Sequence, residues 1–219
     1  MKPFFNSHIK YCVLFIALFS FGCDTLIKPS KEKLNEDAKN KQAYLTLTQT
    51  KKIIKTGDII TRTGNDFTSE CLRKLCRRNT SYSHCGIASI ENDSVFIYHA
   101  LGGDWNPDQK ILRESLEKFG NPLENRGIGI FRLTLSDSLK TALTNCARNF
   151  RSQGIEFDMA FDLKTDNKMY CAEFVAKTIE KASEMAITIH RSRIDSLEFI
   201  GVDDIFLNPA SQKITQLIY

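Results

Sequence analysis

The feature that most constrains this fold is a pair of strand-like segments, residues 82–90 and 94–100, separated by Glu91-Asn92-Asp93. Both segments carry β-branched and aromatic side chains, and the intervening residues form a turn signal. Two strands joined by so short a connection pair antiparallel. The chain therefore contains a β-hairpin here, and the side chains of these two strands are brought together.

This hairpin carries His84 and His99. In an antiparallel pair, opposed residues have a constant sum of residue numbers, and side chains alternate between the two faces. The two histidines therefore share a face only if the turn holds an even number of residues, as it does with Ile90 opposite Val95. A three-residue turn, with Ile90 opposite Ser94, would send the imidazoles to opposite faces.

The apolar pattern of the hairpin favours the even turn. It places Gly86 opposite His99, where the missing side chain leaves room for an imidazole. The two histidines are then diagonal neighbours, about 7–8 Å apart at the backbone. The alternative interpretation is that each is a hydrogen-bonded, half-buried structural residue. The hairpin alone leaves both interpretations open.

Around the hairpin, the expected helices and strands do not follow the β-α-β order of a parallel sheet. The expected fold class is α+β, with an antiparallel sheet packed against helices. The expected helices are residues 34–53, 68–76, 112–119, 136–153 and 169–183, with a last turn at 203–207, and the further strands are 58–62, 128–133 and 213–219.

Cys171 lies at the start of the helix expected over residues 169–183. A thiol at a helix N-terminus faces unpaired backbone N–H groups and the positive end of the helix dipole, which favour the thiolate. The same N–H groups could receive an oxyanion. The alternative is that Cys171 is a small buried apolar residue, the usual role of a cysteine inside a helix.

The other cysteines of the globular part are expected to be packing residues. Cys85 falls on the strand face opposite His84, and Cys146 lies inside a helix. Cys71 and Cys76 are five residues apart on one expected helix, a spacing that points them to different faces. We therefore expect packing thiols there and no disulfide.

The first 22 residues resemble an export signal. Lys2 and Lys10 precede an apolar stretch over residues 11–22. As a helix this stretch is roughly 18 Å long, short of the roughly 30 Å hydrocarbon core of a membrane. A small residue, Gly22, stands directly before Cys23, an arrangement similar to the lipobox of bacterial lipoproteins, although Ser20 stands where that pattern has Leu. The alternative is ordinary secretion without a lipid.

These features predict three segments: a lipoprotein signal peptide at 1–22, a polar tether at 23–42 that is lipidated on Cys23, and a single domain at 43–219. The expected location is the bacterial cell envelope, with the protein anchored to a membrane by its lipid and facing the periplasm or lying in the outer membrane. We expect a monomer.

Charge and motifs exclude other partners. The formal charge is +4, and it falls to +2 (4 − 2) when Lys2 and Lys10 leave with the signal, which is no signature of nucleic-acid binding. There is no C-x-x-C or H-E-x-x-H motif. A zinc site built from His84, His99 and Cys171 is therefore an alternative without a supporting motif. We expect neither a metal nor a cofactor.

Three separated motifs carry a family resemblance. Residues 83–87 read Ser-His-Cys-Gly-Ile, residues 98–100 read Tyr-His-Ala, and residues 170–175 read Tyr-Cys-Ala-Glu-Phe-Val. The first two are similar to the "HVGI…HA" hairpin of NlpC-type cell-wall cysteine hydrolases, and the third looks like the start of their nucleophile helix. Here the cysteine follows the hairpin, 87 residues after His84. That order resembles the permuted branch, which includes YiiX-like proteins and relatives of lecithin retinol acyltransferase.

The resemblance extends over residues 55–183, because Gly57-Asp58-Ile59-Ile60 and Phe157-Asp158 also look YiiX-like. It implies a permuted papain-like fold in which Cys171 is the nucleophile, His84 the general base and His99 the residue that orients the base. Tyr82, on the face of His84, is a candidate oxyanion donor. The hairpin is three residues longer than the commonest NlpC-type spacing.

The resemblance implies a cysteine peptidase or amidase that cleaves an amide bond through a thioester acyl-enzyme, with peptidoglycan stem peptides as the expected substrate. One alternative is a lipid acyl hydrolase or acyltransferase that uses the same Cys-His-His site. The other is an envelope lipoprotein that binds a peptide or lipid without catalysis, which the intact Cys171, His84 and His99 disfavour.

The lipid anchor can be tested directly. Cys23→Ser should move the protein from membrane to soluble fractions, because the acylated residue is lost. The wild-type protein should have a mass that lacks the first 22 residues and includes added acyl chains. An unmodified N-terminus anywhere after Cys23 would refute the lipoprotein interpretation.

Overall fold

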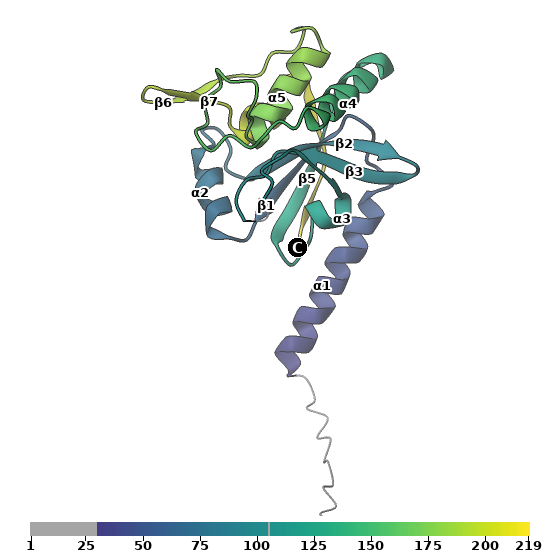
Figure 1. The fold of residues 1–219 in the computed structure, drawn as a ribbon. Coiled ribbons are helices and arrows are strands. Elements are labelled where there is room, and N and C mark those ends of the chain that lie inside the picture. The colour runs from purple at the N-terminus through teal and green to yellow at the C-terminus, as the bar shows by residue number, and fades with distance from the viewer. Residues whose placement is uncertain (1–29, 105) are drawn as a thin grey trace, which may run out of the picture.

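A computed structural model describes residues 30–104 and 106–219. Its centre is a six-stranded antiparallel sheet with the strand order β4-β3-β2-β1-β5-β8 (Figure 1). A separate two-stranded hairpin is formed by β6 and β7. The strands are β1 (Ile59–Gly64), β2 (His84–Glu91), β3 (Ser94–His99), β4 (Leu112–Ser115), β5 (Asn125–Leu133), β6 (Ser192–Ile194), β7 (Leu197–Phe199) and β8 (Ser211–Ile218).

Helices cover both faces of this sheet. Helices α4 and α5 lie on one face, and α1 and the short α3 lie on the other (Figure 1). The mixture of helices with an antiparallel sheet confirms the α+β class. The helices are α1 (Lys31–Thr50), α2 (Phe67–Leu75), α3 (Leu116–Phe119), α4 (Asp137–Ser152), α5 (Cys171–Ala182) and α6 (Val202–Phe206).

The alternation of strand side chains divides the interior into two apolar clusters. On β1, Ile59 packs into the cluster formed with α4, α5 and α6, whereas Ile60 packs into the cluster that contains Leu47 of α1 and Phe119 of α3. Both isoleucines are fully buried. The sheet is therefore buried on both faces at its centre, and the two faces have different helical partners.

The hairpin has the register that the sequence predicts. Ile90 pairs with Val95, and a two-residue turn links β2 to β3. Both turn residues have left-handed backbone conformations, with φ of 47° at Asn92 and 62° at Asp93. This is the type I′ geometry that matches the twist of hairpin strands. Asn and Asp tolerate positive φ better than other non-glycine residues, which explains their presence here.

Two helices begin at other residues than expected, because strand pairing or an N-cap sets where they start. The helix expected over 112–119 is wrong in its first half, because Leu112 pairs with His99 and begins β4. Helix α2 starts after Asp66, whose side chain caps Ser69, rather than after Thr68. The β6–β7 hairpin was not expected.

Helix α1 begins at Lys31, so the second half of the segment expected as a tether is helical. Residues 1–22 and Cys23, on which the export signal and lipidation depend, lie outside the described residues. Among the described residues, no helix is both long and apolar enough to cross a membrane.

Gly86 is a position where the fold requires glycine. A Cβ atom there would lie 2.7 Å from the carbonyl oxygen of Tyr98 and 3.0 Å from Cβ of His99. Gly86→Ala should therefore lower the free energy of unfolding by about 1–3 kcal/mol, the usual cost of overpacking. Chemical denaturation measures this effect, with Ser94→Ala on the same hairpin as an exposed control that should stay within about 0.5 kcal/mol. Equal stability of the two variants would show that β2 and β3 are not paired this closely.

Candidate active site

The hairpin brings the two predicted histidines into direct contact. Nε2 of His84 lies 2.9 Å from Nδ1 of His99, within hydrogen-bond distance. Both rings pack against Phe119 of α3, with ring centroids 5.7 and 5.0 Å from its centroid. His99 is fully buried, and His84 is 6% exposed. The shared face predicted for the two imidazoles is therefore observed.

Glu114 of β4 adds a third member to this pair. Its Oε2 lies 3.1 Å from Nε2 of His99, and its Oε1 lies 2.7 Å from Nζ of Lys118. Glu114 opposes Ile97 in the β3–β4 pairing, so its side chain falls on the sheet face that also carries His99. The three side chains form a hydrogen-bonded chain across β4, β3 and β2.

This chain fixes which nitrogens carry protons. An ionised carboxylate only accepts hydrogen bonds, so the proton of a neutral His99 must be on Nε2, which donates to Glu114. Nδ1 of His99 is then an acceptor, and Nε2 of His84 must donate to it. Nδ1 of His84 keeps its lone pair and has no hydrogen-bond partner in the described part of the chain. It is the nitrogen that can act as a general base.

Burial keeps both imidazoles neutral at pH 7. Burial lowers the pKa of His84 well below 6.5, and the positive charge of Arg62 lowers it further. Burial also lowers the pKa of His99, although the hydrogen bond to Glu114 opposes this effect. In Glu114, burial opposes ionisation, but hydrogen bonds from His99 and Lys118 outweigh it and lower the pKa to about 2. The proton arrangement above requires these charge states.

Arg62 places a fixed positive charge beside the site. It opposes His84 in the β1–β2 pairing, and its guanidinium carbon lies 4.8 Å from the ring centroid of Phe119. It also donates to the carbonyl oxygen of Phe119 at 2.9 Å. A cation in this position disfavours an imidazolium on His84 and favours a thiolate on Cys171.

Cys171 is the first residue of α5 and is 8% exposed. The N–H of Tyr170 donates to Oε2 of Glu173 at 3.2 Å, which ties down the start of the helix. Hydrogen bonding from the Cys85 thiol, together with backbone N–H groups and the charge of Arg62, lowers the pKa of Cys171 against the opposing effect of burial. The local environment therefore favours the thiolate at Cys171.

Three other thiols ionise less readily than an ordinary cysteine. Burial raises the pKa of Cys85 well above 9.0, that of Cys76 to about 12, and that of Cys146 above its ordinary value. All five cysteines of the described region are free thiols. Cys76 and Cys85 are buried, as expected, but the packing role expected for Cys71 is wrong, because its side of α2 faces solvent.

Near the start of β2, Cys171 and the two imidazoles pack against opposite faces of the sheet. Cys171 is next to Cys85 on the side of α5, and the imidazole of His84, the preceding residue, packs against Phe119 of α3. Among the hydrogen bonds of the described residues, none joins Cys171 to an imidazole. The contact between Cys171 and His84 thus stays a prediction; bonds of this kind commonly tighten only when substrate binds.

Tyr82 is buried and packed like a core residue. Its ring packs edge-on against Phe131 and Phe206, with centroids 5.8 and 5.2 Å away. Its hydroxyl and that of Thr61 both lie over Gly129, where a Cβ would be 2.5 and 2.6 Å from the two oxygens. An oxyanion role would require the hydroxyl to leave this position, and that role stays a prediction.

The geometry defines a class of protein before any comparison is made. A thiol at a helix N-terminus, beside a hairpin that carries a hydrogen-bonded histidine pair, is the arrangement of papain-like cysteine hydrolases. Residues 53–194 match the family described as permuted papain-like amidase enzymes, YaeF/YiiX, C92 family. This match covers more than half of the chain, and the chain belongs to that family.

A solved structure supports the fold. The crystal structure of the metalloprotein YiiX from Escherichia coli O157:H7 is similar, with a TM-score of 0.62 and 17% sequence identity, over 75% of this chain and 98% of the other. No curated relative matches the chain. Among the described residues, no group of three or more His, Cys, Asp or Glu side chains is arranged to hold a metal ion.

The nucleophile assignment can be tested by alkylation. In a Cys71→Ser background, which removes the exposed thiol, iodoacetamide at pH 7 should label Cys171 faster than Cys76 or Cys146, because only the thiolate reacts and the pKa of Cys171 is lowered. Peptide mass mapping over time gives the three rates. Faster labelling of Cys76 or Cys146 would make the assignment wrong.

Glu114 is a positioning residue whose effect can be separated from stability. Glu114→Gln can donate to Nε2 of His99 and so reverse the proton order along the chain, which would place a proton on Nδ1 of His84. We expect the rate of p-nitrophenyl ester hydrolysis to fall at least about tenfold in kcat, with KM preserved. Lys118→Gln removes the other partner of Glu114 and should keep wild-type kcat. Full activity of Glu114→Gln would contradict the chain of hydrogen bonds as a working unit.

Proposed function

We propose that this protein hydrolyses an amide bond through a thioester acyl-enzyme on Cys171, with His84 as the general base and His99 as the residue that orients it. The observation that carries the proposal is the hydrogen-bonded chain from Glu114 through His99 to His84, which leaves Nδ1 of His84 as the unpartnered nitrogen. A purely structural histidine pair does not need a defined free nitrogen, and α5, which packs on β2, begins with a thiol whose pKa is lowered.

The reaction follows from these protonation states. Nδ1 of His84 takes the thiol proton, and the sulfur of Cys171 attacks the carbonyl carbon of the substrate. The C–N bond then breaks, and the imidazolium of His84 gives the proton to the leaving amine. A water molecule attacks the thioester, with His84 taking its proton; the C–S bond then breaks, the acid is released, and the sulfur of Cys171 takes the proton back from His84. Each half of the reaction thus returns His84 to the neutral form that its lowered pKa favours.

In the proposed reaction, backbone N–H groups at the start of α5 donate hydrogen bonds to the oxyanion. The first N–H groups of a helix have no partner within that helix. We assign the N–H groups at Cys171 to the carbonyl oxygen of a bound substrate, which becomes negative during attack, and the charge of Arg62 would add to the same effect. This backbone site is the oxyanion hole that we propose, and it needs no side-chain donor.

For the substrate, the first candidate is a peptidoglycan stem peptide in the cell envelope. It is supported by the resemblance to cell-wall hydrolases and by the export signal and lipidation site expected at residues 1–23. An anchor on Cys23, followed by α1, would hold the domain near a membrane. A second candidate is an acyl lipid, and it is favoured by a specific observation: the wall beside Cys171 is apolar.

The proposal predicts that Cys171→Ala abolishes hydrolysis and changes the free energy of unfolding by no more than about 1–2 kcal/mol, because only one small buried group is lost. Cys146→Ala is the matched control and should keep full activity. Purified muropeptides and acyl lipids, each incubated with the wild-type protein and both variants, give the product by mass spectrometry. If neither substrate nor a p-nitrophenyl ester reacts in a Cys171-dependent way, the proposal of a thiol hydrolase is wrong.

A further inference from the structure

Cys85 lies directly beside the candidate nucleophile, and the proposed mechanism gives it no chemical role. The thiol of Cys85 donates a hydrogen bond to the sulfur of Cys171, and the backbone N–H of Cys85 donates another. Cys85 is the second residue of β2, and Cys171 is the first residue of α5, which packs on β2. Both belong to the apolar cluster between that helix and the sheet. The two sulfurs therefore face each other, as two cysteines must if a disulfide is to join them.

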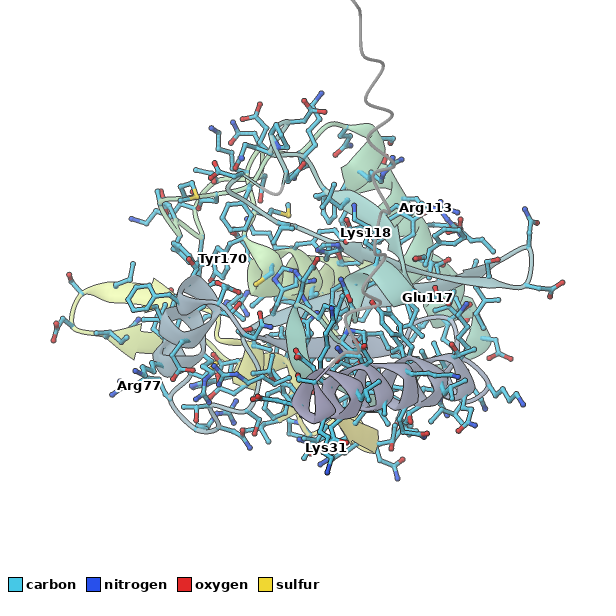
Figure 2. All side chains as sticks on the ribbon, turned by 90° about the horizontal axis from the view of Figure 1, so that it is seen from below. Lys31, Arg77, Arg113, Glu117, Lys118 and Tyr170 are labelled. Carbon is cyan, nitrogen blue, oxygen red and sulfur yellow. The ribbon has the colours of Figure 1, made fainter. Side chains whose placement is uncertain are left out.

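The two thiols differ in their access to solvent. Cys171 is 8% exposed, whereas Cys85 is fully buried. Figure 2 shows Tyr170, which directly precedes Cys171, at the end of α5 that lies beside α2. A small oxidant can therefore reach Cys171 from solvent at that end of the helix, whereas Cys85 offers it no surface.

The two thiols also differ in how readily they ionise. Hydrogen bonding from Cys85 and the charge of Arg62 lower the pKa of Cys171, whereas burial and the neighbouring Cys171 raise the pKa of Cys85. Thiolate character and exposure together make a cysteine susceptible to peroxides. Cys171 is therefore the member of this pair that is oxidised first, and a reduced thiol then stands next to it.

We infer that Cys85 is a resolving thiol, which forms a reversible disulfide with Cys171 when a hydroperoxide oxidises the nucleophile. In the first step, the sulfur of Cys171 attacks the terminal oxygen of the peroxide. An S–O bond forms and the O–O bond breaks, so that the sulfur is oxidised by two electrons to a sulfenic acid. The peroxide is reduced, and its leaving oxygen takes a proton from solvent to give water or an alcohol.

In the second step, the sulfur of Cys85 attacks the sulfur of Cys171. An S–S bond forms, the S–O bond breaks, and the hydroxide that leaves combines with the thiol proton of Cys85 to give water. The first step favours the second. Besides burial, a hydrogen bond to Cys171 and the charge of its thiolate raise the pKa of Cys85. A sulfenic acid carries no thiolate charge, so that part of the effect is lost once Cys171 is oxidised.

The disulfide has two consequences for the protein. It shields Cys171 from a second molecule of peroxide, which would oxidise the sulfenic acid irreversibly to a sulfinic acid. It also stops hydrolysis until a dithiol restores both thiols, because a sulfur held in a disulfide cannot attack a carbonyl carbon. The loss of hydrolysis rests on the proposed function, whereas the formation of the disulfide does not.

Cys76 is a second buried thiol in this region, and it provides the matched control. It is 5% exposed, and it lies close enough to Cys85 to raise the pKa of that thiol. Its own sulfur, however, is hydrogen-bonded to the carbonyl oxygen of Tyr82 at 3.8 Å. The inference therefore assigns the disulfide to Cys85 and not to Cys76, although both thiols are buried near the nucleophile.

Peptide mapping tests the disulfide without any assay of activity. A Cys71→Ser protein, which lacks the exposed thiol, is treated with hydrogen peroxide at pH 7, blocked with N-ethylmaleimide and digested without reductant. Mass spectrometry should show the peptides of Cys85 and Cys171 joined, with the mass of the intact protein lowered by two hydrogen atoms, and dithiothreitol should reverse both changes. A disulfide between Cys76 and Cys171, or a sulfinic acid on Cys171 with Cys85 still a free thiol, would overturn the inference.

Recovery of activity tests the protective role, with Cys85→Ala and Cys76→Ala compared in the same background. Hydrolysis of p-nitrophenyl acetate is measured before peroxide, after peroxide and after dithiothreitol, and each protein is scored against its own untreated rate. The parent protein and Cys76→Ala should regain their activity, whereas Cys85→Ala should regain at least about fivefold less, because its Cys171 proceeds to the sulfinic acid. Equal recovery in Cys85→Ala and the parent would contradict the inference.

The two experiments separate this inference from the proposed function. If the disulfide between Cys85 and Cys171 forms while hydrolysis continues at its full rate, the resolving thiol is confirmed and the thiol mechanism is wrong. If the parent protein loses its activity to peroxide and no such disulfide forms, the mechanism stands and the resolving thiol is wrong. Should Cys85→Ala fail to fold, the peptide map of the parent protein decides alone.

Discussion

The hydrogen bond between Nε2 of His84 and Nδ1 of His99 is the contact on which the site depends. It exists because the β2–β3 turn holds two residues, so that both imidazoles project from one face. A turn of three residues would separate them, whatever the rest of the sequence did. Gly86 completes the requirement, because a side chain there would collide with His99. The chemistry of the protein is thus set by the backbone geometry of a hairpin.

The charges at the two ends of the histidine pair set the order of protons along it. Glu114 is ionised at one end and Arg62 is cationic near the other, and the two imidazoles between them are buried and neutral. The proton order that follows leaves the lone pair on Nδ1 of His84, a residue that pairs with Arg62 of β1. At the start of α5, hydrogen bonding from the Cys85 thiol, backbone N–H groups and the charge of Arg62 lower the pKa of Cys171. Different elements of the fold therefore set the protonation state of the base and the pKa of the nucleophile.

The sequence predicts those parts of the site that are local. The hairpin register follows from residue numbering and alternation, and the helix-opening position of Cys171 follows from the start of its apolar stripe. Glu114 could not be found in this way, because its role depends on β4 pairing with β3 across a loop, and residues 112–119 read as one short helix. The apolar cavity beside Cys171 was equally hidden, because α2 and the β6–β7 hairpin, which both line it, are more than 100 residues apart in the chain.

The most direct measurement of the central claim is the tautomeric state of His84. In ¹⁵N-histidine-labelled protein at pH 7, the account predicts a neutral imidazole with its proton on Nε2, a bare Nδ1, and a scalar coupling across the hydrogen bond to Nδ1 of His99. His84→Gln and His99→Gln variants assign the signals. A proton on Nδ1 of His84, or an imidazolium at that pH, would contradict the hydrogen-bond order from Glu114 and with it the proposed base.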